Sequence, residues 1–286
     1  MILSQQITKI KETIMYKVFD AHTHTYPESI AAKARVNLGI FYDFYCEGLG
    51  TYSHLESQAK ENNVCGYLLF AVATNSHQVT KVNDGIANLV KLSRSHGFNT
   101  IGFAGMYQDY PDFETEINRA ESIGLQGVKI HPDIQRVDID SGKLYPLYEI
   151  LQSKNWPLYL HMGDPRPEYQ YSTPEKLLNV LRDFPKLRVV AAHLGGYGVW
   201  DHSAELLSGK ENVSYDTSSS LWSPVMTPEK AKKIIHSLGY ENIMFGTDYP
   251  VVNTKEELER FMAIGLSDKE NEDILWNNAM RIFDIK

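Results

Sequence analysis

This 286-residue sequence has little cysteine, no long apolar run and no excess of basic residues. The two cysteines, Cys46 and Cys65, are too few for a disulfide framework and lack metal-ligand spacing, so we expect reduced thiols. The longest apolar run, VCGYLLFAVA at 64–73, has about ten residues, whereas a membrane helix needs roughly 20. A net charge of -8 with both signs interspersed provides no basic stripe for nucleic acid. We therefore expect neither a membrane nor a nucleic-acid partner.

Signals for export and for a domain boundary are also missing. Residues 1–15 have neither the apolar core nor the small-residue cleavage site of a secretory signal, so we expect a cytoplasmic protein. Met15 stands just before the first predicted strand, which makes residues 1–15 either an N-terminal extension or an extended reading frame upstream of a start at Met15. No Pro-, Gly- or Ser-rich linker divides the chain, which predicts a single domain over residues 1–286.

Short β-rich apolar runs alternate along the chain with polar stretches of helical periodicity. Thr173 and Thr227 each precede Pro-Glu and an apolar helical pattern, which is typical of a helix cap and first turn. The alternation indicates βα units and a parallel sheet. Eight units in a chain near the usual ~250 residues predict an α/β fold, a closed (β/α)8 TIM barrel rather than an open doubly wound sheet. The eight runs are 17–24, 64–73, 100–106, 125–132, 157–163, 188–196, 212–218 and 242–250.

The connection between the first two predicted strands, residues 25–63, is the irregular one. It carries the aromatic-rich stretch AAKARVNLGIFYDFYCEGLGTY before a helix that begins near Ser53. An insertion at this point of a parallel barrel lies at the mouth of the active site. We expect it to act either as a lid or as a covering subdomain on the rim, and the sequence does not decide between the two.

Histidine and aspartate close several of the apolar runs, which is where chemistry gathers in a parallel barrel. His22 and His24 are two residues apart in a strand, so their side chains face the same side and can share one cation. His161 and Asp248, at the ends of other runs, complete the three or four nitrogen and oxygen ligands of a catalytic metal site. We predict one divalent metal, with zinc ahead of manganese because nitrogen ligands suit zinc. We predict that His193 serves in acid/base chemistry or polarises a carbonyl group, and that Asp248 both touches the metal and accepts a proton from water.

Other polar residues near strand ends have less certain roles. Lys129 lies two residues before His131 and should face the same way; it contacts the site or substrate, carries a carboxylated amine that bridges a second metal, or forms a salt bridge inside the barrel. His131 is equally well explained as a structural histidine. An arginine at the rim suits a substrate carboxylate through bidentate pairing, or forms a rim salt bridge. The candidates for substrate contact are Arg136, Arg166, Tyr215, Asp216 and Trp222.

Five segments resemble the motifs of the amidohydrolase superfamily, in the branch that includes aminocarboxymuconate-semialdehyde decarboxylase. They are FDAHTH at 19–24, GVKIHP at 127–132, LYLHMG at 158–163, VVAAHLGG at 189–196 and MFGTDYP at 244–250. The resemblance covers nearly the whole barrel and implies a TIM-barrel metal-dependent enzyme. It implies that His22, His24, His161 and Asp248 are metal ligands, and that His193 contacts the attacking water or the substrate. Binuclear members often use a carboxylated lysine, and Lys129 stands where such a residue would.

Three functions remain in competition at this stage. The leading hypothesis is hydrolysis of a small, carboxylated amide or lactone by metal-activated water. The alternative is non-oxidative decarboxylation of an unsaturated or aromatic acid, in which His193 protonates carbon. The third is a catalytically silent metal-binding barrel, which the open histidine/aspartate site opposes because structural zinc sites are usually closed and rich in cysteine. Aromatic residues also allow a homo-oligomer, which the sequence does not decide.

Overall fold

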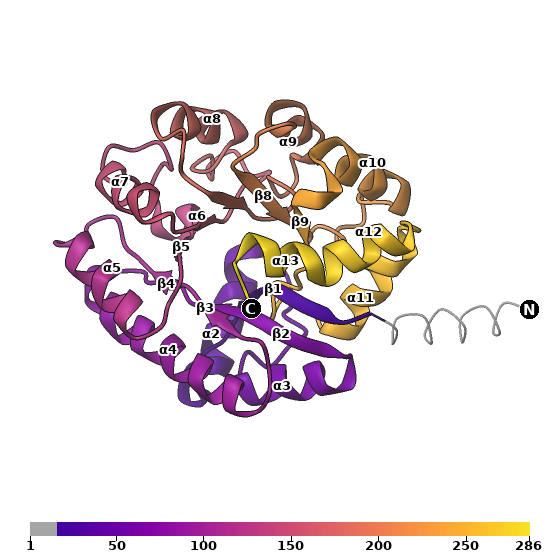
Figure 1. The fold of residues 1–286 in the computed structure, drawn as a ribbon, viewed down its shortest axis with the longest axis horizontal. Helices are drawn as coiled ribbons and strands as arrows, with labels where there is room; N and C mark the ends of the chain where they lie inside the picture. The colour runs from indigo at the N-terminus through magenta and orange to yellow at the C-terminus, as the bar shows by residue number, and fades with distance from the viewer. Residues whose placement is uncertain (1–15) are drawn as a thin grey trace, which may run out of the picture.

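The computed structural model describes residues 16–286, so the expected N-terminal extension, residues 1–15, lies outside the described part. Parallel pairing joins the strands into two sheets, with the orders β1-β2-β3 and β4-β5-β6-β7-β8-β9 (Figure 1). The strands are β1 (Val18–His24), β2 (Val64–Phe70), β3 (Ile101–Gly102), β4 (Ala104–Gly105), β5 (Val128–Ile130), β6 (Leu158–Leu160), β7 (Val189–Ala191), β8 (Val213–Asp216) and β9 (Ile243–Met244). Each of the eight predicted runs contains one strand, except 100–106, which contains both β3 and β4.

Backbone hydrogen bonds connect the two sheets on both sides. Between β3 and β4, the N–H of Phe103 donates to Leu69 and the next N–H, that of Ala104, donates to Gly127. This single stretch of chain therefore changes its neighbour from β2 to β5. On the other side, the N–H of Ala21 donates to Phe245 at 2.9 Å, which joins β1 to the segment after β9. The predicted (β/α)8 TIM-barrel fold is confirmed, with the third barrel strand divided at Phe103.

The helices between the strands surround the sheets, and the C-terminal helices cross one end of them (Figure 1). Thr173 and Thr227 cap their helices as predicted, each accepting a backbone hydrogen bond before a Pro in the first turn. The remaining bounds are η1 (Ser76–Gln78), α4 (Val79–Ser95), α5 (Phe113–Ser122), α6 (Pro132–Gln135), α7 (Tyr145–Lys154), α8 (Pro174–Asp183), α9 (Trp200–Leu207), α10 (Pro228–Leu238), η2 (Tyr240–Asn242), α11 (Thr254–Ala263), α12 (Asp268–Glu272), the π-helical turn η3 (Asp273–Asn277) and α13 (Asn278–Ile282).

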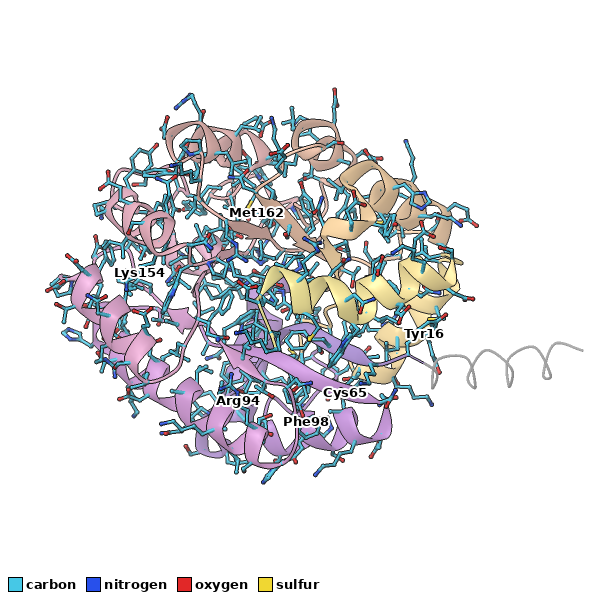
Figure 2. The ribbon with its side chains drawn as sticks, in the orientation of Figure 1. Tyr16, Cys65, Arg94, Phe98, Lys154 and Met162 are labelled. Atoms are coloured by element: carbon cyan, nitrogen blue, oxygen red, sulfur yellow. The ribbon has the colours of Figure 1, made fainter. Side chains whose placement is uncertain are left out.

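Apolar side chains fill the space inside the strands and between strands and helices (Figure 2). Phe19, near the start of β1, packs against Phe283 and Trp276, with ring centroids 6.3 and 6.4 Å apart. The C-terminal helices thus close the end of the barrel where the strands begin. The polar residues lie at the opposite end of the barrel, where β1 finishes at His24. Cys46 and Cys65 are both free, as expected.

The insertion at residues 25–63 forms two helices, α2 (Glu28–Tyr42) and α3 (Tyr52–Glu61). The helix predicted near Ser53 is α3. The outer side of α2 is unusually apolar, because Val36 and Ile40 are 56% and 76% exposed. Whether α2 moves as a lid, and whether it meets a second copy of the chain, both remain predictions. Within residues 16–286 no helix is long and apolar enough to cross a membrane.

Candidate metal centre and adjoining cavity

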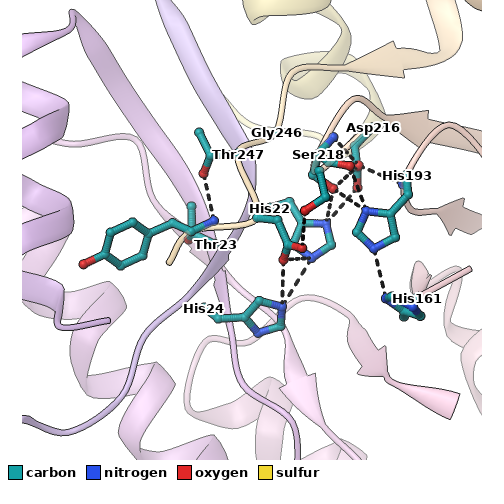
Figure 3. A network of polar contacts seen from close by, with 12 residues as sticks. His22, Thr23, His24, His161, His193, Asp216, Ser218, Gly246 and Thr247 are labelled. Carbon is teal, nitrogen blue, oxygen red and sulfur yellow. Dashed lines mark hydrogen bonds and ion pairs between the residues drawn. The ribbon is translucent and has the colours of Figure 1, made fainter. Parts of the chain in front are cut away.

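His22 and His24 lie side by side at the carboxyl end of β1 (Figure 3), and Asp248 meets them there. The Nε2 atoms of the two histidines are 3.3 Å apart, and Asp248 Oδ1 lies 3.2 Å from His22 and 3.6 Å from His24. Asp248 reaches this position because its backbone N–H donates to the His22 carbonyl at 2.9 Å, beside β1. The side chain of Asp248 is 15% exposed, whereas His22 is only 1% exposed. The predicted pairing of the HxH motif with Asp248 is therefore present in the fold.

A buried carboxylate behind His22 determines which of its nitrogens is free. His22 Nδ1 lies 2.9 Å from Asp216 Oδ2, and Asp216 is fully buried. Because a carboxylate only accepts hydrogen bonds, His22 carries a proton on Nδ1, which leaves Nε2 as the nitrogen that can bind a cation. The sequence suggested Asp216 as a substrate contact, but the structure makes it a support for His22. The only signal of Asp216 in the sequence was its place at the end of an apolar run.

His193 and His161 form the second half of the polar cluster (Figure 3). His193 Nε2 lies 2.9 Å from His161 Nδ1, and the rings of His193 and His22 have centroids 5.2 Å apart. His193 Nδ1 lies 2.8 Å from the carbonyl oxygen of Ser218, so it donates there and leaves Nε2 as an acceptor. His161 does not belong to the tight group of His22, His24 and Asp248. It contacts His193, whose ring in turn lies beside that of His22.

Burial and mutual contact perturb the titration of these groups. Burial lowers the pKa of His193 to about 3, and the neighbouring His161 adds to the effect. Burial likewise holds the pKa of His24 well below its ordinary value. For Asp248, burial acts to raise the pKa, but His22 and the other histidines outweigh it and hold the pKa well below the usual range. Burial acts to lower the pKa of His22, but the carboxylates of Asp248 and Asp216 outweigh it and raise the pKa. An ionised carboxylate beside imidazole nitrogens is a donor set in which a metal cation can replace protons.

The donor set of this centre fits a divalent metal. His22 Nε2 lies 3.2 Å from an ionised oxygen of Asp248, with His24 Nε2 beside both. Ligand atoms this close together share a positive charge between them, which is a proton or a metal cation. Imidazole nitrogen with carboxylate oxygen is the ligand chemistry of catalytic zinc sites, and of manganese when oxygen ligands are more numerous.

Lys129 lies in β5 and His131 directly follows that strand, which pairs with β6, the strand before His161. Lys129 Nζ is 3.5 Å from His22 Nε2 and 4.7 Å from the ring centroids of both Phe70 and Tyr159. Burial lowers the pKa of this lysine to about 8. His131 begins α6, and its ring stacks on that of His161 at 4.0 Å. The structure thus brings both residues to the site, and carboxylation of Lys129 stays a prediction.

The two candidate arginines do not line the cavity. Arg136 is exposed and ends the short helix α6. Arg166 pairs with Asp164, at 2.6 Å, and donates to the carbonyl of Phe41 at the end of α2. Its guanidinium also lies 4.0 Å from the ring centroid of Tyr169. Arg166 therefore anchors the insertion, and the predicted role of both arginines in binding a substrate carboxylate gains no support from their position.

A cavity of about 350 Å³ opens above the polar cluster. Its floor includes His24, His161, His193 and Asp248, and its walls are mainly apolar and aromatic. Trp222 lines the cavity, as expected for a substrate contact, whereas Tyr215 does not. The insertion supplies much of the wall, including Leu38, Phe41, Tyr42 and Phe44, which the sequence did not single out.

The family model described as Amidohydrolase matches residues 19–285 of the chain. This chain belongs to the amidohydrolase family. The family expected from the motifs is confirmed, and it is a family of enzymes. The candidate metal site lies at the carboxyl ends of the strands, where active sites lie in this fold.

Curated and solved relatives of this amidohydrolase include several decarboxylases. The 2-amino-3-carboxymuconate-6-semialdehyde decarboxylase of Caenorhabditis elegans is 26% identical over 238 residues, which cover 59% of this chain and 58% of that protein. The chain therefore spans little more than half the length of that relative. The 5-carboxyvanillate decarboxylase of Sphingomonas paucimobilis has a TM-score of 0.73 at 16% identity, covering 95% of this chain and all of that one. A dihydroxybenzoic acid decarboxylase of Polaromonas sp., solved with manganese and the inhibitor 2-nitroresorcinol, has a TM-score of 0.71 at 17% identity, covering 94% and 97%.

Proposed function

We propose that this amidohydrolase is a non-oxidative decarboxylase of a small aromatic or unsaturated carboxylic acid. The observation that carries the proposal is the cavity, whose aromatic walls enclose a floor of histidines and Asp248. Its volume of about 350 Å³ is at the small end of the range for ligand sites, which suits a single ring. The relatives named above act on carboxylated substrates of this kind, which favours decarboxylation over the hydrolysis that the sequence placed first.

We propose His22, His24, His161 and Asp248 as the residues that hold one divalent metal. Zinc suits the nitrogen-rich set, and manganese is the ion bound in a structural neighbour, so both belong in the test. A metal held there supplies positive charge that binds and orients the substrate carboxylate. Asp216 leaves His22 Nε2 as the nitrogen that can bind the metal, and the Ser219 hydroxyl holds Asp248 Oδ2 at 2.7 Å.

The reaction requires a proton for the carbon that loses its carboxylate. His193 lies on the cavity floor, and its Nε2 is the nitrogen not committed to Ser218. Because burial disfavours the charged imidazole, a protonated His193 gives up its proton readily. The proton forms a C–H bond, the bond between that carbon and the carboxylate breaks, its electron pair returns to the carbon framework, and carbon dioxide leaves. His193 then regains a proton from water.

Product analysis with the metal-loaded chain tests this function. We expect carbon dioxide and one deuterium on the product carbon when a hydroxybenzoate or an unsaturated acid reacts in D₂O. His193→Asn keeps an amide that can donate to the Ser218 carbonyl, and we expect it to lower kcat by about 10²–10⁴-fold. The control is His202→Asn, since His202 is an exposed residue of α9 paired with Glu175.

Hydrolysis would give a different result at the same site. Turnover of an amide or lactone with incorporation of oxygen from water, and no carbon dioxide from any acid, would refute the decarboxylase proposal. An His193→Asn variant that turns over a carboxylic acid at the normal rate would refute the role of His193 alone. Absence of all turnover and of substrate binding would favour the silent barrel.

A further inference from the structure

The loop after β5 holds a buried carboxylate that the motifs did not single out. Asp133, in the first turn of α6, is fully buried, and neither of its side-chain oxygens has a hydrogen-bond partner among the described residues. Its ion pair is with His161, whose Nε2 lies 3.1 Å from Asp133 Oδ2. An uncompensated carboxylate in the interior costs several kcal/mol. A proton on His161 Nε2 would lower this cost, because it places positive charge beside the carboxylate.

The other nitrogen of His161 faces His193. His161 Nδ1 and His193 Nε2 are 2.9 Å apart, and His193 Nε2 is an acceptor because its Nδ1 donates to Ser218. A proton on His161 Nδ1 alone would donate to His193 Nε2, but the Nε2 lone pair of His161 would then face the buried carboxylate of Asp133, which is repulsive. With the proton on Nε2, the Nδ1 lone pair of His161 faces the polar cluster instead.

We infer that Asp133 is a positioning residue: its carboxylate, 3.1 Å from His161 Nε2, favours a proton on that nitrogen and so keeps Nδ1 free to coordinate the metal. The inference rests on the proposed ligand set of His22, His24, His161 and Asp248. Asp216 makes the same kind of contact with His22, through Nδ1 at 2.9 Å. Partners that hold the second nitrogen of a metal-bound histidine typically contribute 10–100-fold to metal affinity.

A separate cation held by His131, Asp133 and His161 is the main rival explanation, because their ligand atoms also lie close together. The ring geometry opposes it. The His131 and His161 rings are stacked at 4.0 Å with an interplanar angle of 13°. An imidazole binds a metal along its lone pair, which lies in the ring plane, so two stacked rings cannot both direct a lone pair at one ion. His131 Nε2 is also occupied, since the Tyr42 hydroxyl lies 3.0 Å away.

The first test is ¹⁵N NMR of the histidines in the full chain loaded with zinc. We expect His161 to coordinate through Nδ1 and to retain its proton on Nε2. Coordination through Nε2 would overturn the inference. This measurement uses the unaltered chain, so it does not depend on whether a variant folds.

The second test is the zinc affinity of Asp133→Asn, measured by titration against a competing chelator. We expect a loss of about 10–100-fold, with an Asp138→Asn control unchanged because Asp138 pairs with Lys176 outside the site. An Asp133→Asn affinity within twofold of wild type would overturn the inference. So would two zinc ions per chain of which this variant loses one. His161→Ala separates the two proposals: if it binds zinc normally, the ligand set is wrong; if it loses zinc while Asp133→Asn does not, only the role of Asp133 is wrong.

Discussion

Asp216→Asn tests whether one buried carboxylate determines the proton position of His22. One oxygen of Asp216 receives His22 Nδ1 at 2.9 Å, and the other receives the backbone N–H groups of His193 and Ser218 at 3.0 and 2.9 Å. Tyr159 also donates to the first oxygen. Asparagine preserves the shape of the side chain but has one acceptor oxygen in place of two.

The magnitude follows from the two orientations open to the amide. If its NH₂ group faced the backbone of His193 and Ser218, two buried N–H groups would lose their acceptor, at about 1–3 kcal/mol each. The NH₂ group is therefore expected to face His22, whose proton must then move to Nε2. His22 loses the lone pair that would bind the metal. We expect the zinc affinity to fall about 10–100-fold, which corresponds to about 1.4–2.8 kcal/mol.

The assay is a zinc titration against a competing chelator, with thermal unfolding of the metal-free chain as a check of folding. Asp164→Asn is the matched control, because Asp164 is also a buried carboxylate but pairs with Arg166 away from His22. A zinc affinity within twofold of wild type for Asp216→Asn would refute the reasoning. An equal loss in the control would show that any buried carboxylate has the same effect.

Two further predictions concern stability and substrate binding. Glu257 in α11 is fully buried, and burial raises its pKa to about 8 despite Arg260 at 3.1 Å. Because the folded state binds this proton more tightly than the unfolded state, its contribution is present below about pH 4.5 and is lost as pH rises toward 8. As the pH rises from 5 to 7.5, the free energy of unfolding of wild type should therefore fall by about 3 kcal/mol relative to that of Glu257→Gln. Denaturant unfolding at each pH measures this difference. Equal pH dependence of the two proteins would mean that Glu257 is ionised in the fold. Trp222→Ala removes an aromatic wall of the cavity and should weaken binding of an aromatic acid by about 3–10-fold with little change in kcat, measured by calorimetry and kinetics; unchanged affinity would place the substrate elsewhere.

The sequence alone determined the architecture and the residues at the centre of the site. Alternating apolar runs and capped helices specify βα units because strand and helix periodicities are local properties of the chain. The HxH spacing placed His22 and His24 on one face for the same reason. The expectation that strand ends carry the chemistry then brought His193 and Asp248 to the same place, and the structure agrees.

Only the tertiary structure decided which side chains support these residues and what covers them. Asp216 and His22 are 194 residues apart in the chain, so no local pattern relates them. The same holds for Arg166, which resembled a substrate-binding arginine in the sequence but reaches back to Phe41 and anchors α2. The walls of the cavity come from that helix, whose apolar residues face both inward and outward and so give no clear periodic signal. Local periodicity determines where a strand ends, whereas the direction of a loop and the partner of a buried charge depend on packing between segments distant in sequence.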